Sequence, residues 1–317
     1  MRFFLRKFLH LLIVVFAVTA LTYLMVERVP ADIAGEIAGQ NATTEELVAI
    51  RARLGLNEPA LARYVKWVSG VMKGDLGNSL ATRQPVTEAL RSHLPVTLEL
   101  IALAQLFALL LALPIGIITA WRAGSWLDRA IGTAAFGFAS LPAYAGAIAL
   151  VFIFSLRLKW LPATGYTPFA EGIVANIRGF LLPALAIAMV EWVVLMRVLR
   201  SDLIATLKED FILLARCKGL PPWRILLTHA LRPSCFTFIT VLGMQTASLV
   251  GGALIVELIF SLPGVGRLLV SAINSQDYPM VQGCVLLIAI GYVAINFLVD
   301  IIYGLLDPRV RKGLSHG

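Results

Sequence analysis

Six long apolar runs alternate with shorter polar segments along the 317 residues. A helix that crosses a membrane needs about 20 predominantly apolar residues. Runs such as LIALAQLFALLLALPIGIITA keep no polar stripe, whereas a core helix of a water-soluble protein normally has one. The pattern therefore predicts an all-α polytopic membrane protein with six transmembrane helices: Phe8–Val26, Val96–Ala120, Arg129–Leu156, Leu181–Leu199, Pro233–Phe260 and Cys284–Leu306.

The composition agrees with a membrane protein, because 59% of the residues are hydrophobic and 15% are charged. A soluble domain typically has about 25% charged residues. The first apolar run follows Arg2, Arg6 and Lys7 and could be a signal peptide. Its apolar core exceeds the usual stretch of roughly 7–15 residues, and no clean small-x-small cleavage site follows it. We therefore expect an uncleaved first helix.

Basic residues gather in four of the segments that flank the six runs. Short loops rich in Lys and Arg mark the cytoplasmic side of a membrane protein. All four basic segments fall on one side if the N-terminus is inside, so both termini and the segment between runs four and five are expected to be cytoplasmic. The basic residues are Arg2, Arg6, Lys7, Arg122, Arg129, Arg197, Arg200, Lys208, Arg216, Lys218, Arg224, Arg232, Arg309, Arg311 and Lys312.

The long segment after the first run is predicted to be a small helical extracytoplasmic subdomain. Thr43 and Glu46 have the spacing of a capping box. Apolar residues then recur at helical spacing until two glycines in KGDLGNS end the pattern: Leu61, Val65, Val68 and Met72. The expected division is a cytoplasmic tip with the first helix (1–27), the extracytoplasmic helical segment (28–95), the transmembrane core (96–306) and a cytoplasmic tail (307–317).

The segment Ser201–Pro233 carries charges and two adjacent prolines between two apolar runs. Apolar residues at helical spacing predict a first helix through Leu203, Leu207, Phe211 and Leu214, and a second through Trp223, Leu226, Leu227, Ala230 and Leu231. Gly219 can provide the turn that ends the first helix, and Pro222 suits the first turn of the second. Two bent amphipathic helices can insert into a groove on a partner protein or lie on lipid headgroups.

Catalytic and metal-binding motifs are missing from the sequence. No GxxxxGK[ST], HExxH or GxSxG string is present, so the chain does not bind ATP through a phosphate loop. Three cysteines and four histidines are dispersed along the chain, which argues against a metal site. The net charge of +8 is attributed to the cytoplasmic loops rather than to nucleic acid. A secondary transporter or channel and a membrane enzyme remain as rival classes, and a requirement for ATP would separate them.

Ionisable and amide side chains inside the apolar runs are candidates for a substrate path: Glu191, Gln245 and Glu257. A charge in the bilayer costs a few kcal/mol, so it needs a partner or a watery cavity. Glu191 lies deep in its run and can serve either the path or a structural hydrogen bond. Glu257 and Glu99 lie near outer ends and can simply reach the headgroups, while Asp300 can form a local structural pair.

Small residues and prolines within the runs have two possible meanings. Gly243, Gly251 and Gly252 would allow close helix approach, and Pro142 and Pro183 would kink their helices. Glycine and proline are also simply common in membrane helices.

The string ARCKGLPPWRILLTHALRP resembles the coupling-helix loop of ABC importer permeases. Gly219 and Ala215 match the glycine and second alanine of the EAA loop, whereas Leu213 stands where the wider superfamily has Glu. The peptide and nickel branch favours an ARAKGL type of string, in which Cys217 replaces an alanine. Four more strings resemble that branch in the expected order: GDLGNS at Gly74–Ser79, LPVTLEL at Leu94–Leu100, FSLPGVGRLLVSAINSQDYPMVQG at Phe260–Gly283 and DPRVR at Asp307–Arg311.

This resemblance implies the bacterial inner-membrane permease of a binding-protein-dependent importer for dipeptides, oligopeptides or nickel chelates. It implies four kinds of partner: a second related permease, two cytoplasmic ATPase subunits, an extracytoplasmic binding protein and membrane lipid. ATP and Mg would bind to the ATPases, with no cofactor on this chain. The residues expected to contact the ATPases are Phe211, Ala215, Gly219, Pro222, Trp223, Leu226 and Leu227.

Overall fold

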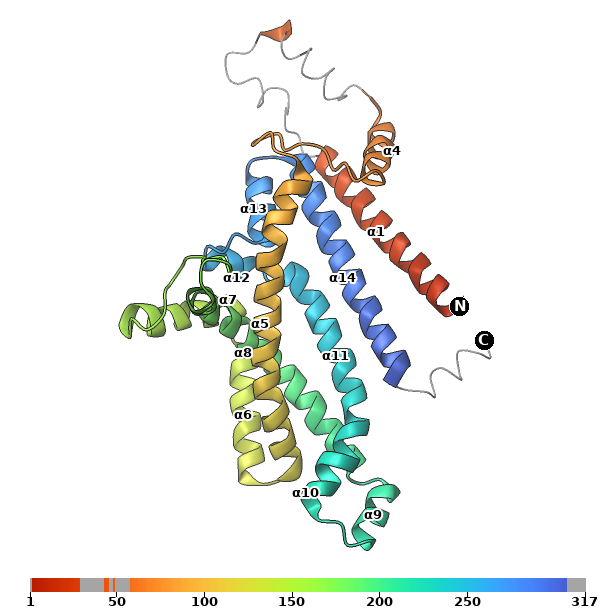
Figure 1. The fold of residues 1–317 in the computed structure, drawn as a ribbon, viewed down its shortest axis with the longest axis vertical. Helices are drawn as coiled ribbons and strands as arrows, with labels where there is room; N and C mark the ends of the chain where they lie inside the picture. The colour runs from red at the N-terminus through yellow and green to blue at the C-terminus, as the bar shows by residue number, and fades with distance from the viewer. Residues whose placement is uncertain (1, 29–42, 46–47, 49–57, 307–317) are drawn as a thin grey trace. The chain divides into compact units, whose positions relative to one another are not determined.

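The computed structural model describes residues 2–28, 43–45, 48 and 58–306, and their regular elements are helices (Figure 1). One isolated bridge joins Asn78 and Pro85 within these residues. The prediction of an all-α chain is therefore confirmed. The helix expected after Thr43 and the tail 307–317 lie largely or wholly outside the described residues.

The chain divides into two compact units. Unit one comprises Met1–Pro95 with Gly264–Gly291, and unit two comprises Val96–Pro263 with Tyr292–Gly317, as far as these residues are described. Each unit has its own apolar interior.

Unit one contains an N-terminal helix and a short helix that contacts it. These are α1 (Arg2–Arg28) and α4 (Ala60–Val71). The hydroxyl oxygens of Tyr64 in α4 and Thr19 in α1 lie 2.9 Å apart, and Phe16 packs edge-on against the Tyr64 ring. The helix predicted for this segment is confirmed, but much of its apolar stripe stays exposed, notably Leu61, Val65 and Met72.

The rest of unit one consists of the GDLGNS turn, the start of α5 (Val86–Trp121), α13 (Val265–Asn274) and the start of α14 (Tyr278–Leu306). The buried Asp277 carboxylate accepts hydrogen bonds from the Ser79 hydroxyl and, at 3.0 Å, from the Leu80 N–H. Two of the strings that resemble the importer family are therefore bonded to each other.

Unit two contains most of the long apolar helices. Its elements are the remainder of α5, α6 (Trp126–Ser140), α7 (Ala143–Leu150), η1 (Val151–Arg157), α8 (Ile173–Thr206), α9 (Asp210–Cys217), α10 (Pro222–Arg224), η2 (Ile225–Ala230), α11 (Leu231–Gly252), α12 (Leu254–Ile259) and the end of α14. Small residues let the helix backbones approach closely. A Cβ on Gly243 of α11 would lie 1.9 Å from a Val299 methyl group, so this glycine is required for the packing of α11 against α14. Gly252 has open space instead.

Four helical stretches are long and apolar enough to cross a membrane: Val86–Trp121, Ile173–Thr206, Pro222–Gly252 and Tyr278–Val299. The helix pair Trp126–Ser140 and Ala143–Arg157 is bent by 98° and makes a fifth span if it counts as one. In α1, the apolar helical stretch is Ile13–Met25, which is shorter than a span. Four to five spans are therefore present in the described residues, and six stays a prediction.

Two of the expected spans differ from the structure in their course. The run Arg129–Leu156 was predicted as one helix, but it breaks between Ser140 and Ala143, because Pro142 holds its preceding residue in extended backbone. The run Pro233–Phe260 is also not one helix. Its helix begins upstream at Pro222 and ends at the weak helix former Gly252, and α12 follows after Ala253.

Candidate coupling segment and buried polar groups

The segment Ser201–Pro233 contains the end of α8, the short helix α9 and the start of the next long helix. One helix was predicted through Leu203 and Phe211, and this is wrong, because α8 ends at Thr206 and α9 begins at Asp210. Glu209 adopts an extended conformation just before α9, and Asp210 adds a negative charge to its first turn, where it favours a helix start.

Gly219 forms the bend after α9, as the sequence predicted. Its φ is +73°, a left-handed conformation that glycine adopts without strain. The Gly219 N–H donates to the Arg216 carbonyl at 2.9 Å, and the Leu220 N–H donates to the Ala215 carbonyl at 3.3 Å. These two bonds make a Schellman motif, which satisfies carbonyl groups that the end of α9 would leave without partners. Pro222 occupies the first helical position of α10, also as predicted.

Both halves of the segment bury some apolar residues and expose others. In α9, Ile212 and Ala215 are buried in the apolar cluster that also contains Leu203. After the bend, Ile225, Leu226 and Ala230 join the same cluster. Five apolar side chains of the segment remain exposed in this chain: Phe211, Leu213, Leu214, Trp223 and Leu227.

The prediction that one apolar face of the second helix contains Trp223, Leu226 and Ala230 together is wrong. An α-helical period places Trp223, Leu226 and Ala230 on one face, yet Trp223 is 62% exposed while the other two are buried. The cause is the π-helical turn η2, whose wider winding shifts side chains around the axis. Leu226 therefore anchors the segment internally, and Trp223 and Leu227 are left on its outside.

An open pocket of about 450 Å³ lies between the segment and the end of α5. Ala120 and Ala123 line it on one side. Its other lining residues come from the end of α8, the turn and α9: Ile204, Leu207, Lys208, Glu209, Asp210, Leu213 and Arg216. Figure 1 shows α9 and α10 at the same end of unit two as the turn between α5 and α6.

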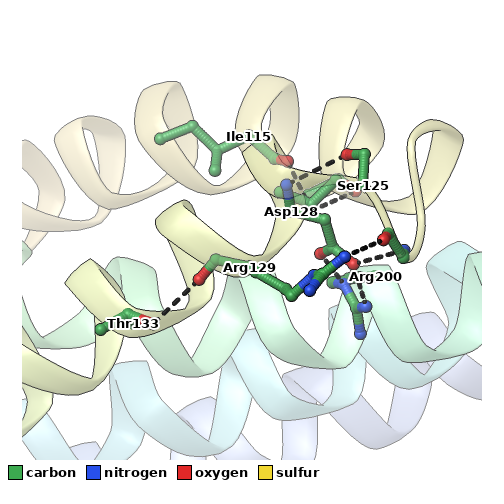
Figure 2. Close-up of polar contacts among 9 residues, drawn as sticks. Ile115, Ser125, Asp128, Arg129, Thr133 and Arg200 are labelled. Atoms are coloured by element: carbon green, nitrogen blue, oxygen red, sulfur yellow. Dashed lines mark hydrogen bonds and ion pairs between the residues drawn. The ribbon is translucent and has the colours of Figure 1, made fainter.

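The turn between α5 and α6 is joined to α8 by an ion pair (Figure 2). Asp128 is in the first turn of α6, where the Ser125 side chain accepts the Asp128 N–H as N-cap. Arg200 donates from Nε to Oδ1 and from Nη2 to Oδ2 of Asp128, each at 2.7 Å. The Asp128 side chain is only 8% exposed and also accepts the Gly124 N–H at 2.9 Å. Sequence reasoning missed this pair, although SWLD has the spacing of a capping box.

The three side chains predicted for a substrate path do not form one polar cluster. Glu257 is fully buried in α12 and accepts a hydrogen bond of 2.6 Å from Thr97, so the alternative that it reaches the headgroups is wrong. Among the described residues, Glu191 in α8 and Gln245 in α11 each have a buried side-chain oxygen without a hydrogen-bond partner. Gln105 in α5, which no sequence pattern marked, is buried, and both of its polar atoms also lack a partner within the described part of the chain.

Two further carboxylates remain from the apolar runs. Glu99 in α5 is half-buried beside Asn176, and its reach to the headgroups stays a prediction. Asp300 lies in α14, and its side chain is outside the described part of the chain.

The helices define a polytopic membrane protein that exposes a bent, apolar and basic segment between two of its spans. Residues 112–312 match the family described as "Binding-protein-dependent transport system inner membrane component", and residues 1–101 match the N-terminal family described as "Binding-prot-dependent transport system membrane comp, N-term". The chain belongs to this family of inner-membrane transport components, as the resemblance implied.

Named relatives cover nearly the whole chain. A Brucella abortus (strain 2308) protein named as a peptide transport system permease is 38% identical over 298 residues, 94% of this chain and 95% of the relative. The di/tripeptide transport system permease protein DppB of Pseudomonas aeruginosa (strain UCBPP-PA14) is 34% identical, covering 93% and 94%. The glutathione transport system permease protein GsiC of Salmonella paratyphi A is 34% identical, covering 98% and 99%.

Proposed function

We propose that this chain is the permease subunit of an ATP-driven ABC importer and forms the path for small peptides delivered by a binding protein. Relatives named for peptide, di/tripeptide and glutathione transport support a peptide-like cargo, since they match this chain almost from end to end. The observation that carries the proposal is the coupling segment, Ser201–Pro233. The inner residues of this segment, such as Ile212 and Leu226, are buried in the apolar cluster, and five of its apolar side chains are exposed.

The coupling segment would bind a groove on a cytoplasmic ATPase subunit. The stretch Pro222–Gly252 has 31 residues. It rises about 46 Å, so it extends past a hydrocarbon core of about 30 Å. Exposed Trp223 and Leu227 at its start are then available outside the membrane, with Lys218 and Arg224 as a charged rim. Exposed aromatic anchors ringed by polar groups are typical of binding surfaces.

The assembly would contain a second related permease, two ATPases that bind ATP and Mg, and a binding protein on the outer side. Both termini would be cytoplasmic, with residues 28–95 outside, 96–306 as the core and 307–317 as a cytoplasmic tail. Glu191 and Gln245 would face the substrate path, because each keeps a buried oxygen without a partner. Glu257 is the weaker candidate, since Thr97 already bonds its carboxylate.

Reporter fusions test the orientation. Fusions after Gly39 and after Lys208 should lie on opposite sides of the membrane, with the second in the cytoplasm. Two fusions on the same side would contradict the six-span arrangement and the position given to the coupling segment.

Reconstituted transport tests the function. The complete assembly in proteoliposomes, with its binding protein, is supplied with labelled dipeptide, tripeptide, glutathione or a nickel chelate, with and without ATP. We expect ATP-dependent uptake of a peptide substrate. Uptake of the nickel chelate alone would reassign the cargo, and uptake that needs no ATP would indicate a channel or secondary transporter instead.

A further inference from the structure

The Asp128–Arg200 ion pair connects the turn between α5 and α6 to the helix that leads into the coupling segment. Arg200 lies six residues before the end of α8 at Thr206, which corresponds to about 9 Å along the helix. Asp128 is the third residue of α6, directly after the turn. The pair therefore joins two places that are distant in sequence: the start of α6, and the part of α8 that lies just before the coupling segment.

The geometry of the Asp128–Arg200 pair fixes how α6 and α8 are oriented along each other, as well as how close they lie. A guanidinium that donates two parallel bonds to one carboxylate is stronger and more specific in orientation than a single charged contact. Here both bonds are 2.7 Å, and the same carboxylate is also held by the Gly124 N–H. The pair consequently defines the register of α6 against α8, and a displacement of one helix along the other would break both bonds.

Apolar packing already holds the helices together at this level. A Cβ on Gly116 of α5 would lie 3.1 Å from a Leu199 side-chain carbon and 3.3 Å from the Met196 carbonyl oxygen of α8. Apolar contacts of this kind resist separation, but packed helices can slide by small shear movements. The ion pair adds the resistance to sliding that the apolar surface lacks.

The open pocket lies between the end of α5 and the coupling segment itself. Ala120 and Ala123 on one side do not fill the space toward Lys208 and Asp210 on the other. Because this pocket is open, α9 can move toward the α5–α6 hairpin without displacing packed side chains. The Asp128–Arg200 ion pair, which lies just before the coupling segment in α8, can transmit such movement to α6.

We propose that Asp128 and Arg200 are positioning residues that make the α5–α6 hairpin move together with the coupling segment during transport. The proposal rests on the proposed function, because it assigns a role within ATP-coupled import. It predicts that weakening the pair changes how much ATP is used per transported peptide, beyond any change in the amount of protein.

The test compares single variants, a charge swap and a neighbouring control. R200K keeps the positive charge but cannot donate the two parallel hydrogen bonds of a guanidinium. D128N removes the negative charge, and D128R/R200D exchanges the acidic and basic residues between the two positions. R129Q is the control, since Arg129 is adjacent and basic and acts on Asp128 only through its charge: its side chain donates an exposed 3.3 Å bond to the Gly124 carbonyl and, among the described residues, no hydrogen bond to the Asp128 carboxylate. For each variant, reconstituted with the ATPases and binding protein, we measure complex yield, ATP hydrolysis without substrate, and ATP consumed per peptide imported.

For R200K and D128N we expect normal complex yield, with ATP per peptide raised about fivefold or more, as for loss of a typical coupling between sites. The swap should restore part of this ratio, and R129Q should leave it unchanged. Unchanged ratios in R200K and D128N, or loss of assembly even in R200K, would make the pair a folding contact and overturn the proposal. Failure of the wild-type assembly to import any peptide would instead contradict the proposed function.

Discussion

The coupling segment and the centre of α8 both keep side chains in surroundings that do not suit them, but in opposite ways. In the coupling segment, Trp223 and Leu213 are both more than half exposed, although each carries a large apolar side chain. In α8, Glu191 keeps a buried carboxylate oxygen that has no hydrogen-bond partner in the described part of the chain. Each arrangement costs free energy in the isolated chain, since apolar surface favours burial and buried polar groups favour hydrogen bonds.

The difference indicates what each region is missing. An exposed apolar surface can be covered by another protein, and under the proposed function a groove on the ATPase covers Trp223 and its neighbours. A buried polar atom is satisfied by water or a polar solute, which would enter when the path opens. The coupling segment is therefore expected to act through binding of a partner, and Glu191 through contact with cargo or its water.

The largest effect is expected for Gly219→Val. Open space surrounds the position, so no clash is expected, but a β-branched residue at φ +73° is strained. Strain of roughly 1–3 kcal/mol would redirect the helix that carries Trp223. We expect normal membrane insertion, with uptake reduced about tenfold or more and weaker retention of the ATPases, because every 1.4 kcal/mol is a factor of ten.

The matched control is Gly219→Asn, because asparagine tolerates left-handed backbone better than other residues. It should retain most uptake and ATPase binding. If Gly219→Val assembles normally and transports at the wild-type rate, the bend is not needed for coupling, and the headgroup-bound alternative becomes the better account of this segment.

Trp223→Ala should give the next largest effect. Truncating an aromatic anchor in an interface typically costs more than about 1 kcal/mol, so ATPase affinity should fall roughly fivefold to tenfold. Trp126→Ala is the control, since Trp126 is 76% exposed at the start of α6 but lies outside the coupling segment. Co-purification of the ATPases over a range of concentrations measures both. Equal losses in the two variants would mean that Trp223 has no specific partner.

Glu191→Gln tests the other region of the comparison. If the carboxylate has no structural partner, the amide should leave thermal stability unchanged or slightly higher, because it carries no charge that is costly in the membrane interior. If the carboxylate contacts the cargo or its water, the same change should alter peptide uptake about threefold or more. Glu58→Gln should have no effect on uptake, as Glu58 is exposed and its ion pair with Lys66, at 3.9 Å, lies on the surface. Lower stability together with unchanged uptake would assign Glu191 a structural role.

Gln105→Leu should alter uptake less than Glu191→Gln, because an uncharged amide is less costly in the membrane interior than a carboxylate and is therefore the weaker mark of a path. Both polar atoms of this side chain are buried without partners, and an unsatisfied buried group costs about 1–3 kcal/mol. Leucine should therefore leave stability equal or higher by about 1 kcal/mol, as measured by denaturant or thermal unfolding in detergent. A large loss of stability would show that the amide has partners and that unsatisfied atoms do not mark the path.

Local backbone chemistry in the coupling segment could be predicted from the sequence. Gly219 and Pro222 have conformational preferences that depend on the residue itself, and both appear where the sequence placed them. At Pro142 the sequence offered only a kink, and the structure has a full break between α6 and α7. The long apolar runs likewise predicted the helices of α5, α8 and α14, because only a helix satisfies its own backbone in lipid.

Features that depend on packing could not be predicted in this way. The π-helical turn at Ile225–Ala230 has no signal in the local residue pattern, so an α-helical period assigned the wrong face to Leu226 and Ala230, which lie in the apolar cluster. The burial of Glu257 depends on Thr97, which is 160 positions away in sequence. Asp128 and Arg200 are 72 positions apart, and no local pattern connects them.

The central claim is that the exposed apolar side of the coupling segment binds the ATPase. Photo-cross-linking tests it directly in native membranes that contain the full assembly, with p-benzoylphenylalanine placed at Trp223 or, as control, at Trp126. We predict covalent adducts between the ATPase and position 223, and lipid adducts alone at position 126. Lipid adducts alone at position 223, with the ATPases present and active, would contradict the claim.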